Sequence, residues 1–200
     1  MRPPKAGLAE RANKPGDSRL SAFTVGYAIY IVISASFMQQ VWQFLTRVLG
    51  KHALYLLCGN LYLFLAVIIC LRLFKSRLHF LRVIASIIIL ALSFLFAWRQ
   101  PFFVEKMHVA EYGFLGWLVM KDLRRRHTIG LAKAMLFSIL FILLVGSIDE
   151  GFQKLLPYRV GEIRDVITNV ISGLSGIVLF FLADEKHKIG NNKFFIYLFG

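Results

Sequence analysis

Residues 129–148 read IGLAKAMLFSILFILLVGSI, and the acidic pair Asp149 and Glu150 follows directly. Twenty helical residues at about 1.5 Å each reach about 30 Å, which is the thickness of the hydrocarbon core of a bilayer. Because lipid cannot hydrogen-bond to the backbone, a segment that crosses it should be a helix. This stretch therefore predicts a membrane-spanning helix that ends close to two carboxylates.

Five further apolar runs of similar length accompany this one. They cover residues 22–46, 53–73, 78–97, 101–120 and 163–183. Together the runs explain why 58% of the 200 residues are hydrophobic, more than is typical of a soluble domain. The ten-residue alternation of a membrane β-barrel is not visible. The predicted fold class is all-α: a polytopic transmembrane bundle of about six helices.

Lys and Arg are unevenly distributed among the connections between these runs. The N-terminal tail, the 72–82 and 121–133 connections and the C-terminal tail hold 17 of the 24 basic residues, and the three alternate connections hold the other seven. Cytoplasmic loops collect Lys and Arg, so both termini should be cytoplasmic. The net charge of +13 is then explained by topology, and we expect no nucleic-acid partner.

Four regions follow from this pattern. Residues 1–21 should be a disordered, basic tail, because prolines, glycines and charges are frequent there. Residues 22–97 should hold three transmembrane helices, and residues 98–183 should hold three more. Residues 184–200 form a polar tail with a short aromatic end that we expect to lie in the membrane interface.

Strongly polar residues interrupt the apolar pattern at two places. One group opens the run at 101–120, and the other joins the runs at 129–148 and 163–183. In the predicted orientation both groups lie on the extracytoplasmic side, and ionisable groups at membrane depth indicate a functional site. The residues expected to line one polar pocket are Lys106, His108, Glu111, Tyr112, Asp149, Glu150, Gln153, Arg159, Asp165 and Asn169.

Helical spacing supports this convergence. His108 and Tyr112 are four residues apart and should share one face. Asp149 and Gln153 align in the same way if their helix continues past Glu150. The run at 163–183 carries a stripe of polar and small residues: Asp165, Asn169, Ser172, Gly173, Ser175 and Gly176. Small residues in such a stripe allow another helix to approach closely.

Other interpretations of the polar residues stay open from the residues alone. A static ion-pair network of Lys106, Arg159 and Arg164 with the carboxylates would be purely structural. The histidine and the carboxylates also offer ligands for Zn or Mn. Neither an HExxH motif nor a cysteine-rich spacing supports a metal site, so we predict no metal and no cofactor.

The polar residues also follow the pattern of a known family. Over about residues 105–176 the chain resembles the VanZ-like family. The motifs that carry the resemblance are His108-x-x-Glu111-Tyr112-x-x-Leu115-Gly116, Asp149-Glu150-x-x-Gln153, Pro157-x-Arg159-x-Gly161 and Asp165-x-x-x-Asn169-x-x-x-Gly173. The resemblance implies a small multi-pass protein of the bacterial inner (plasma) membrane, with residues 98–183 as its VanZ-like core. The family's namesake is associated with resistance to the lipid-tailed glycopeptide teicoplanin.

Two functions are compatible with these expectations. In the first, the outward-facing pocket binds a lipid-linked cell-wall precursor or a lipoglycopeptide among the membrane lipids, and gives glycopeptide resistance of the teicoplanin type.

In the alternative, the protein is a membrane-embedded hydrolase or transferase that acts on a lipid-linked envelope substrate. Glu111 or Asp149 would be the general base, His108 its acid/base partner, and Arg159 with Lys106 an anion clamp. A transporter is disfavoured, because no inverted pair of broken helices is visible. The sequence leaves open whether a reaction is catalysed and which oligomer forms.

Overall fold

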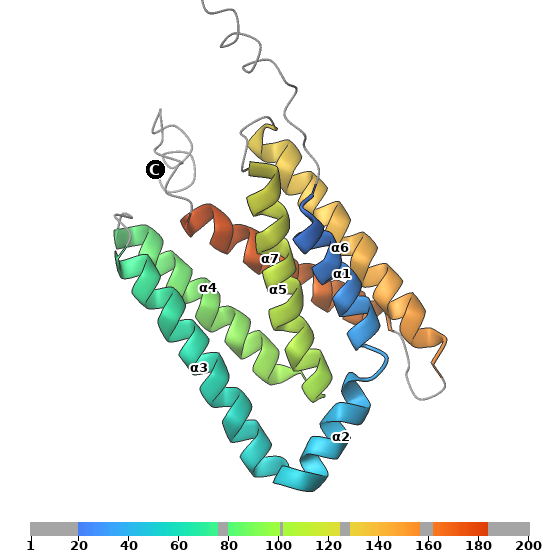
Figure 1. Ribbon diagram of the computed structural model, residues 1–200. Helices are drawn as coiled ribbons and strands as arrows, with labels where there is room; N and C mark the ends of the chain where they lie inside the picture. The colour runs from blue at the N-terminus through green and yellow to red at the C-terminus, as the bar shows by residue number, and fades with distance from the viewer. Residues whose placement is uncertain (1–19, 76–79, 101, 125–128, 157–161, 184–200) are drawn as a thin grey trace, which may run out of the picture.

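The computed structural model describes residues 20–75, 80–100, 102–124, 129–156 and 162–183. Among these residues there is no strand, which confirms the predicted all-α class. The elements, drawn in Figure 1, are α1 (Ala22–Ser34), α2 (Met38–Leu49), α3 (Lys51–Lys75), α4 (Phe80–Arg99), α5 (Phe103–Arg124), α6 (Leu131–Lys154) and α7 (Ile163–Ala183). Helices α3 and α4 lie side by side as a hairpin, and α4 packs against α5 and α7 (Figure 1).

Three helices in the described part of the chain are long and apolar enough to cross a membrane. They are α4, α6 and α7, and the bent pair of α1 and α2 makes a fourth if it is counted as one span. Helices α3 and α5 form where the runs at 53–73 and 101–120 predict them. The multi-pass character is therefore supported, whereas the number of about six crossings and the cytoplasmic termini stay predictions.

The run at 22–46 is two helices and not the single helix that we predict. It breaks after Ser34, and α1 and α2 meet at an angle of 65°. The hydroxyl groups of Ser34 and Ser36 each donate to the carbonyl oxygen three residues earlier. The backbone amides of Ser36 and Phe37 also bond three residues back instead of four. Tightened turns and serine back-bonding of this kind bend helices.

The helix that we predict over residues 129–148 continues beyond residue 148. Helix α6 runs to Lys154, so Asp149 and Gln153 lie one turn apart on the same face, as predicted. Asp149 and Glu150 are buried, with 0% and 4% of their surface exposed. The acidic pair therefore belongs to the interior of the bundle and not to a loop.

Helices α5 and α7 approach each other closely at glycine residues. A Cβ atom added to Gly176 would lie 1.7 Å from the carbonyl oxygen of Gly113, and one added to Gly116 would lie 2.2 Å from that of Gly173. No larger side chain fits at these contacts, so the two helices pack backbone to backbone. The predicted role of the small residues in 163–183 is confirmed.

The outside of the bundle is apolar although its interior contains polar groups. On α6, Leu136, Leu140 and Leu144 are each more than half exposed, whereas Asp149 is fully buried. A soluble monomer rarely presents so much apolar surface to water. This distribution is what a lipid environment requires, and it agrees with a membrane protein of several spans.

Candidate functional site

The first part of the site is a pair of ionisable side chains on α5. His108 Nδ1 lies 2.9 Å from Glu111 Oε2, and both side chains are buried. Three residues separate them, so they are neighbours on the same helical face. The ring of Tyr112 meets that of His108 edge-on, with the centroids 6.0 Å apart. These three side chains of α5 therefore face the interior together.

Tyr112 connects this pair to α6. Its hydroxyl donates to Asp149 Oδ2 at 3.0 Å, and neither residue is exposed. One turn later, Gln153 Nε2 donates to Asp149 Oδ1 at 3.1 Å and to Glu150 Oε1 at 3.3 Å. A donor shared by two carboxylates lowers the cost of their burial. We call the following six residues the polar cluster: His108, Glu111, Tyr112, Asp149, Glu150 and Gln153.

Glu150 extends the polar cluster to the start of α7. Its Oε2 accepts a hydrogen bond of 3.2 Å from the backbone N–H of Glu162, the residue just before that helix. N–H groups at a helix start lack partners within the helix. In a capping box, a glutamate of the same helix accepts such a bond. Here a neighbouring helix supplies the carboxylate, so the cluster connects three helices.

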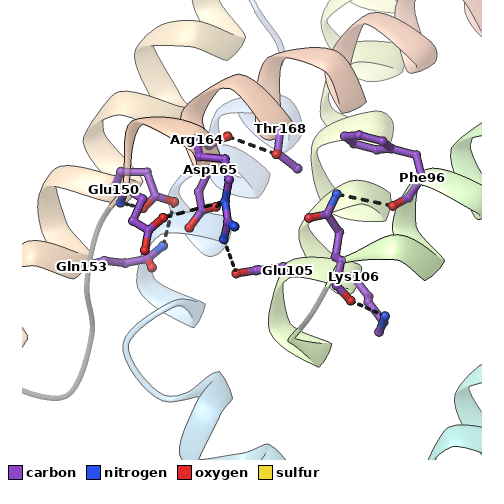
Figure 2. Close-up of polar contacts among 10 residues, drawn as sticks. Phe96, Glu105, Lys106, Glu150, Gln153, Arg164, Asp165 and Thr168 are labelled. Carbon is purple, nitrogen blue, oxygen red and sulfur yellow. Dashed lines mark hydrogen bonds and ion pairs between the residues drawn. The ribbon is translucent and has the colours of Figure 1, made fainter.

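A more exposed group of ion pairs lies at the edge of the polar cluster. Arg164 Nη2 lies 3.4 Å from Glu105 Oε1 on α5, and its Nε lies 3.4 Å from Asp165 Oδ1 and 3.8 Å from Glu162 Oε2. Figure 2 shows Arg164 and Asp165 between Glu150 on one side and Glu105 on the other. Asp165, which we predict to line the pocket, therefore pairs with Arg164 at this edge. Because the Arg164 side chain is 57% exposed, these pairs add little stability.

Lys106 does not lie in the polar cluster, although we predict that it lines the pocket. Its ammonium group donates to the carbonyl oxygens of Trp98 at 2.7 Å, of Ala97 at 3.5 Å and of Gln100, at the end of α4. A cation is favourable there, because the last carbonyl groups of a helix lack partners. Two helical residues turn the chain by about 200°, so Lys106 and His108 point to opposite sides of α5. The structure thus does not support an anion clamp built with Lys106.

Asn169 lies beside the polar cluster on α7. It is 1% exposed, and it packs against Gly146 of α6, where the ring of Tyr112 is also in contact distance. Its Nδ2 has no hydrogen-bond partner among the described residues. A buried amide without a partner carries a free-energy cost, which a bound acceptor would relieve. Arg159, the last of the predicted pocket residues, lies outside the described part of the chain.

A small cavity lies away from the polar cluster, between α3, α4 and α5. Its volume is about 50 Å³, and Cys58, Phe94, Trp98 and Met107 are among its lining residues. This volume is far below the several hundred Å³ of a typical ligand site. The cavity therefore does not compete with the polar cluster as the candidate site.

Comparison with protein families gives a match over part of the chain. Residues 95–184 match the VanZ/LLP1 family. The chain carries a VanZ-like domain. The predicted resemblance is confirmed, and the whole polar cluster lies in the matched residues, whereas α1, α2 and α3 precede them. Comparison with curated proteins and with solved structures gave no match.

The polar cluster of the VanZ-like domain contains more acidic than basic groups. Glu111, Asp149 and Glu150 contribute three carboxyl groups, and His108 contributes one imidazole. Carboxylates accept hydrogen bonds, so the cluster suits a ligand group with ammonium, amide or hydroxyl donors. Within the described residues, no group of three or more His, Cys, Asp or Glu side chains is placed to hold a metal ion.

Sequence reasoning missed the glycine residues of α5 that meet the predicted small-residue stripe of α7. Gly113 and Gly116 meet Gly176 and Gly173, and a Cβ added to Gly173 would also lie 2.6 Å from the side chain of Ile142 on α6. The signal was present, because Gly113 and Gly116 are three residues apart, as are Gly173 and Gly176. Matching sets of small residues on two apolar helices are typical of close contacts in membranes.

Proposed function

We propose that the VanZ-like domain binds the polar part of a lipid-linked envelope molecule or lipoglycopeptide at the polar cluster, and thereby gives glycopeptide resistance of the teicoplanin type. One observation carries the proposal. Six polar side chains of α5 and α6 are buried together inside a bundle whose outer surface is apolar.

Stability alone does not account for this burial. Removing charged groups from water costs several kcal/mol each, and well-packed apolar residues often stabilise a protein as much or more. Asp149 and Glu150 sit next to each other at less than 5% exposure, which adds mutual repulsion. Ionisable residues kept at such a cost in membrane proteins mark sites for substrates or ions.

The hydrogen-bonding character of the site favours a glycan or peptide group. The carboxylates of the polar cluster accept hydrogen bonds, and the buried Nδ2 of Asn169 can donate one. Sugar hydroxyls and peptide groups satisfy both needs, because each carries donors and acceptors. The lipid part of such a ligand would stay among the acyl chains that face the apolar outer surface.

Drug susceptibility of a sensitive bacterium that expresses the chain tests this proposal. Wild type should raise the inhibitory concentration of teicoplanin, and Glu111→Gln and Asp149→Asn should abolish the increase while the protein stays abundant in membranes. Glu162→Gln serves as the matched control, because its side chain is half exposed and should leave resistance unchanged. Full resistance in both cluster variants would contradict the proposal.

His108 Nδ1 and Glu111 Oε2, 2.9 Å apart, also suit an acid/base catalyst, so the alternative function is an enzyme. Mass spectrometry separates the two functions. Purified protein incubated with teicoplanin or with a lipid-linked cell-wall precursor should leave the mass of the ligand unchanged if it only binds. A product of altered mass that forms with wild type and not with Glu111→Gln would show a hydrolase or transferase instead.

A further inference from the structure

Helix α2 stands apart from the rest of the bundle. It leaves α1 at an angle of 65°, and none of its twelve residues is buried. It contacts α3 and α5 at one end of the molecule (Figure 1). At about 18 Å, the helix is too short to cross a hydrocarbon core of about 30 Å.

The residues of α2 are divided between an apolar and a polar face. Val41, Phe44 and Val48 follow the spacing of one helical face and are 40%, 64% and 63% exposed. Gln43 lies opposite Val41, and Arg47, one turn after Gln43, borders the apolar face; both are also exposed. A helix with this division between two faces and a low overall hydrophobicity is typical of segments that lie in a membrane interface.

Aromatic contacts hold α2 near the start of α5. The ring of Trp42 stacks on Phe103, with the centroids 3.5 Å apart and the planes 5° from parallel, and Tyr55 meets Trp42 edge-on at 5.7 Å. Phe103 lies two residues before Glu105, so α2 is at the end of the bundle where Glu105 pairs with Arg164. Trp and Tyr are enriched at the boundary between acyl chains and water.

We infer that α2 lies parallel to the membrane plane, with the side chain of Phe44 among the acyl chains and Arg47 among the head groups. Its partner is thus the lipid bilayer itself, and the 65° bend turns the chain from a crossing direction into the interface. This inference concerns the first part of the chain, outside the VanZ-like domain, and does not depend on the proposed function.

Spin labels on α2 in the full-length chain provide the test. Single cysteines replace residues 41, 43, 44, 47 and 48 in a Cys58→Ser, Cys70→Ser background, and the protein is placed in vesicles of phosphatidylethanolamine and phosphatidylglycerol. At positions 41, 44 and 48, oxygen should reach the label readily and a water-soluble nickel chelate should not. At positions 43 and 47 the preference should be reversed.

The depth of the labels distinguishes the alternatives. Positions 41, 44 and 48 should lie at the same depth, whereas a helix that continues the crossing would change depth by about 10 Å over these seven steps. Leu136, Leu140 and Leu144 on α6 are the control, because labels there should change depth steadily by about 12 Å. A label depth that changes steadily along α2 would overturn the inference. So would labels at positions 41, 44 and 48 that neither oxygen nor the nickel chelate reaches, because this result would show that protein covers this face.

Discussion

At the scale of single residues, each side chain of the polar cluster depends on a neighbour for its hydrogen bonds. Asp149 receives one donor from Tyr112 on α5 and another from Gln153 on its own helix. Because Asp149 is fully buried, no bulk water can replace a donor that is lost. The contact between Tyr112 and Asp149 is therefore where a small chemical change should have a measurable effect.

Tyr112→Phe removes one hydroxyl and leaves a buried carboxylate oxygen of Asp149 without its donor. We expect the free energy of unfolding in detergent to fall by about 0.5–2 kcal/mol, the range of buried hydrogen bonds in proteins and membranes. The double variant with Asp149→Asn should lose less than the sum of the two single losses. Additive losses in this cycle would show that the two residues do not interact.

Lys106→Met tests the corrected position of the lysine. The variant loses the cation at the end of α4, so the unfolding free energy should fall by about 0.5–1 kcal/mol. Teicoplanin resistance, compared at equal protein abundance, should stay at the wild-type level. Resistance that disappears while the unfolding free energy is unchanged would instead support the anion clamp.

The position of Lys106 could not have been predicted from its residue type. A lysine near a polar group is equally compatible with ligand binding and with capping a helix that ends nearby. Helical spacing places Lys106 and His108 on opposite sides of α5, but only the structure shows that α4 ends beside Lys106. His108, Glu111 and Tyr112 were predictable as a set, because helical spacing alone places them on one face.

At the scale of helices, the spacing between α5 and α7 depends on glycine. The carbonyl oxygen of Gly113 lies where a side chain at Gly176 would begin. Any larger residue must push the helices apart, and this movement would disturb the hydrogen bond between Glu150 and the start of α7. The packing of apolar helices and the geometry of the polar cluster are thus coupled.

Gly176→Ala should lower the unfolding free energy by about 1–3 kcal/mol or more, because the added methyl group overlaps backbone atoms. Gly59→Ala is the matched control: a Cβ there meets nothing within 4 Å, so this variant should be neutral or slightly more stable. Thermal denaturation of both proteins in the same detergent makes the comparison. Equal stability of the two variants would contradict the close approach of α5 and α7.

The helices were largely predictable from the apolar runs, because length and hydropathy define a segment that must be helical in lipid. The run at 163–183 coincides with α7, and α6 begins two residues after its predicted start. The break after Ser34 was not predictable in this way. It results from hydrogen bonds of Ser34 and Ser36 to the local backbone, which do not change the apolar character of the run.

At the scale of the whole molecule, the polar cluster, the bent helix α2 and the start of α5 lie at one end of the bundle. The uneven distribution of Lys and Arg predicts that this end faces away from the cytoplasm. Such an orientation is needed if the polar cluster is to meet a cell-envelope ligand.

Cysteine labelling measures this orientation. In the Cys58→Ser, Cys70→Ser background, Lys154→Cys at the exposed end of α6 should react with a membrane-impermeant maleimide in intact spheroplasts. Arg126→Cys and Lys188→Cys should react only after lysis, because the 121–133 connection and the C-terminal tail are predicted to be cytoplasmic. The reverse pattern would turn the polar cluster toward the cytoplasm.

In the proposed function, the polar cluster holds an envelope molecule through its buried carboxylates. The most direct measurement is a mass-spectrometric inventory of lipid-linked species that co-purify with wild type and with Glu111→Gln, normalised to folded protein. We predict a lipid-linked envelope species that is retained by wild type and reduced about tenfold or more in the variant, as expected for the loss of about 1.5–3 kcal/mol in a hydrogen bond to a charged group. Identical species in equal amounts on both proteins would contradict the proposal.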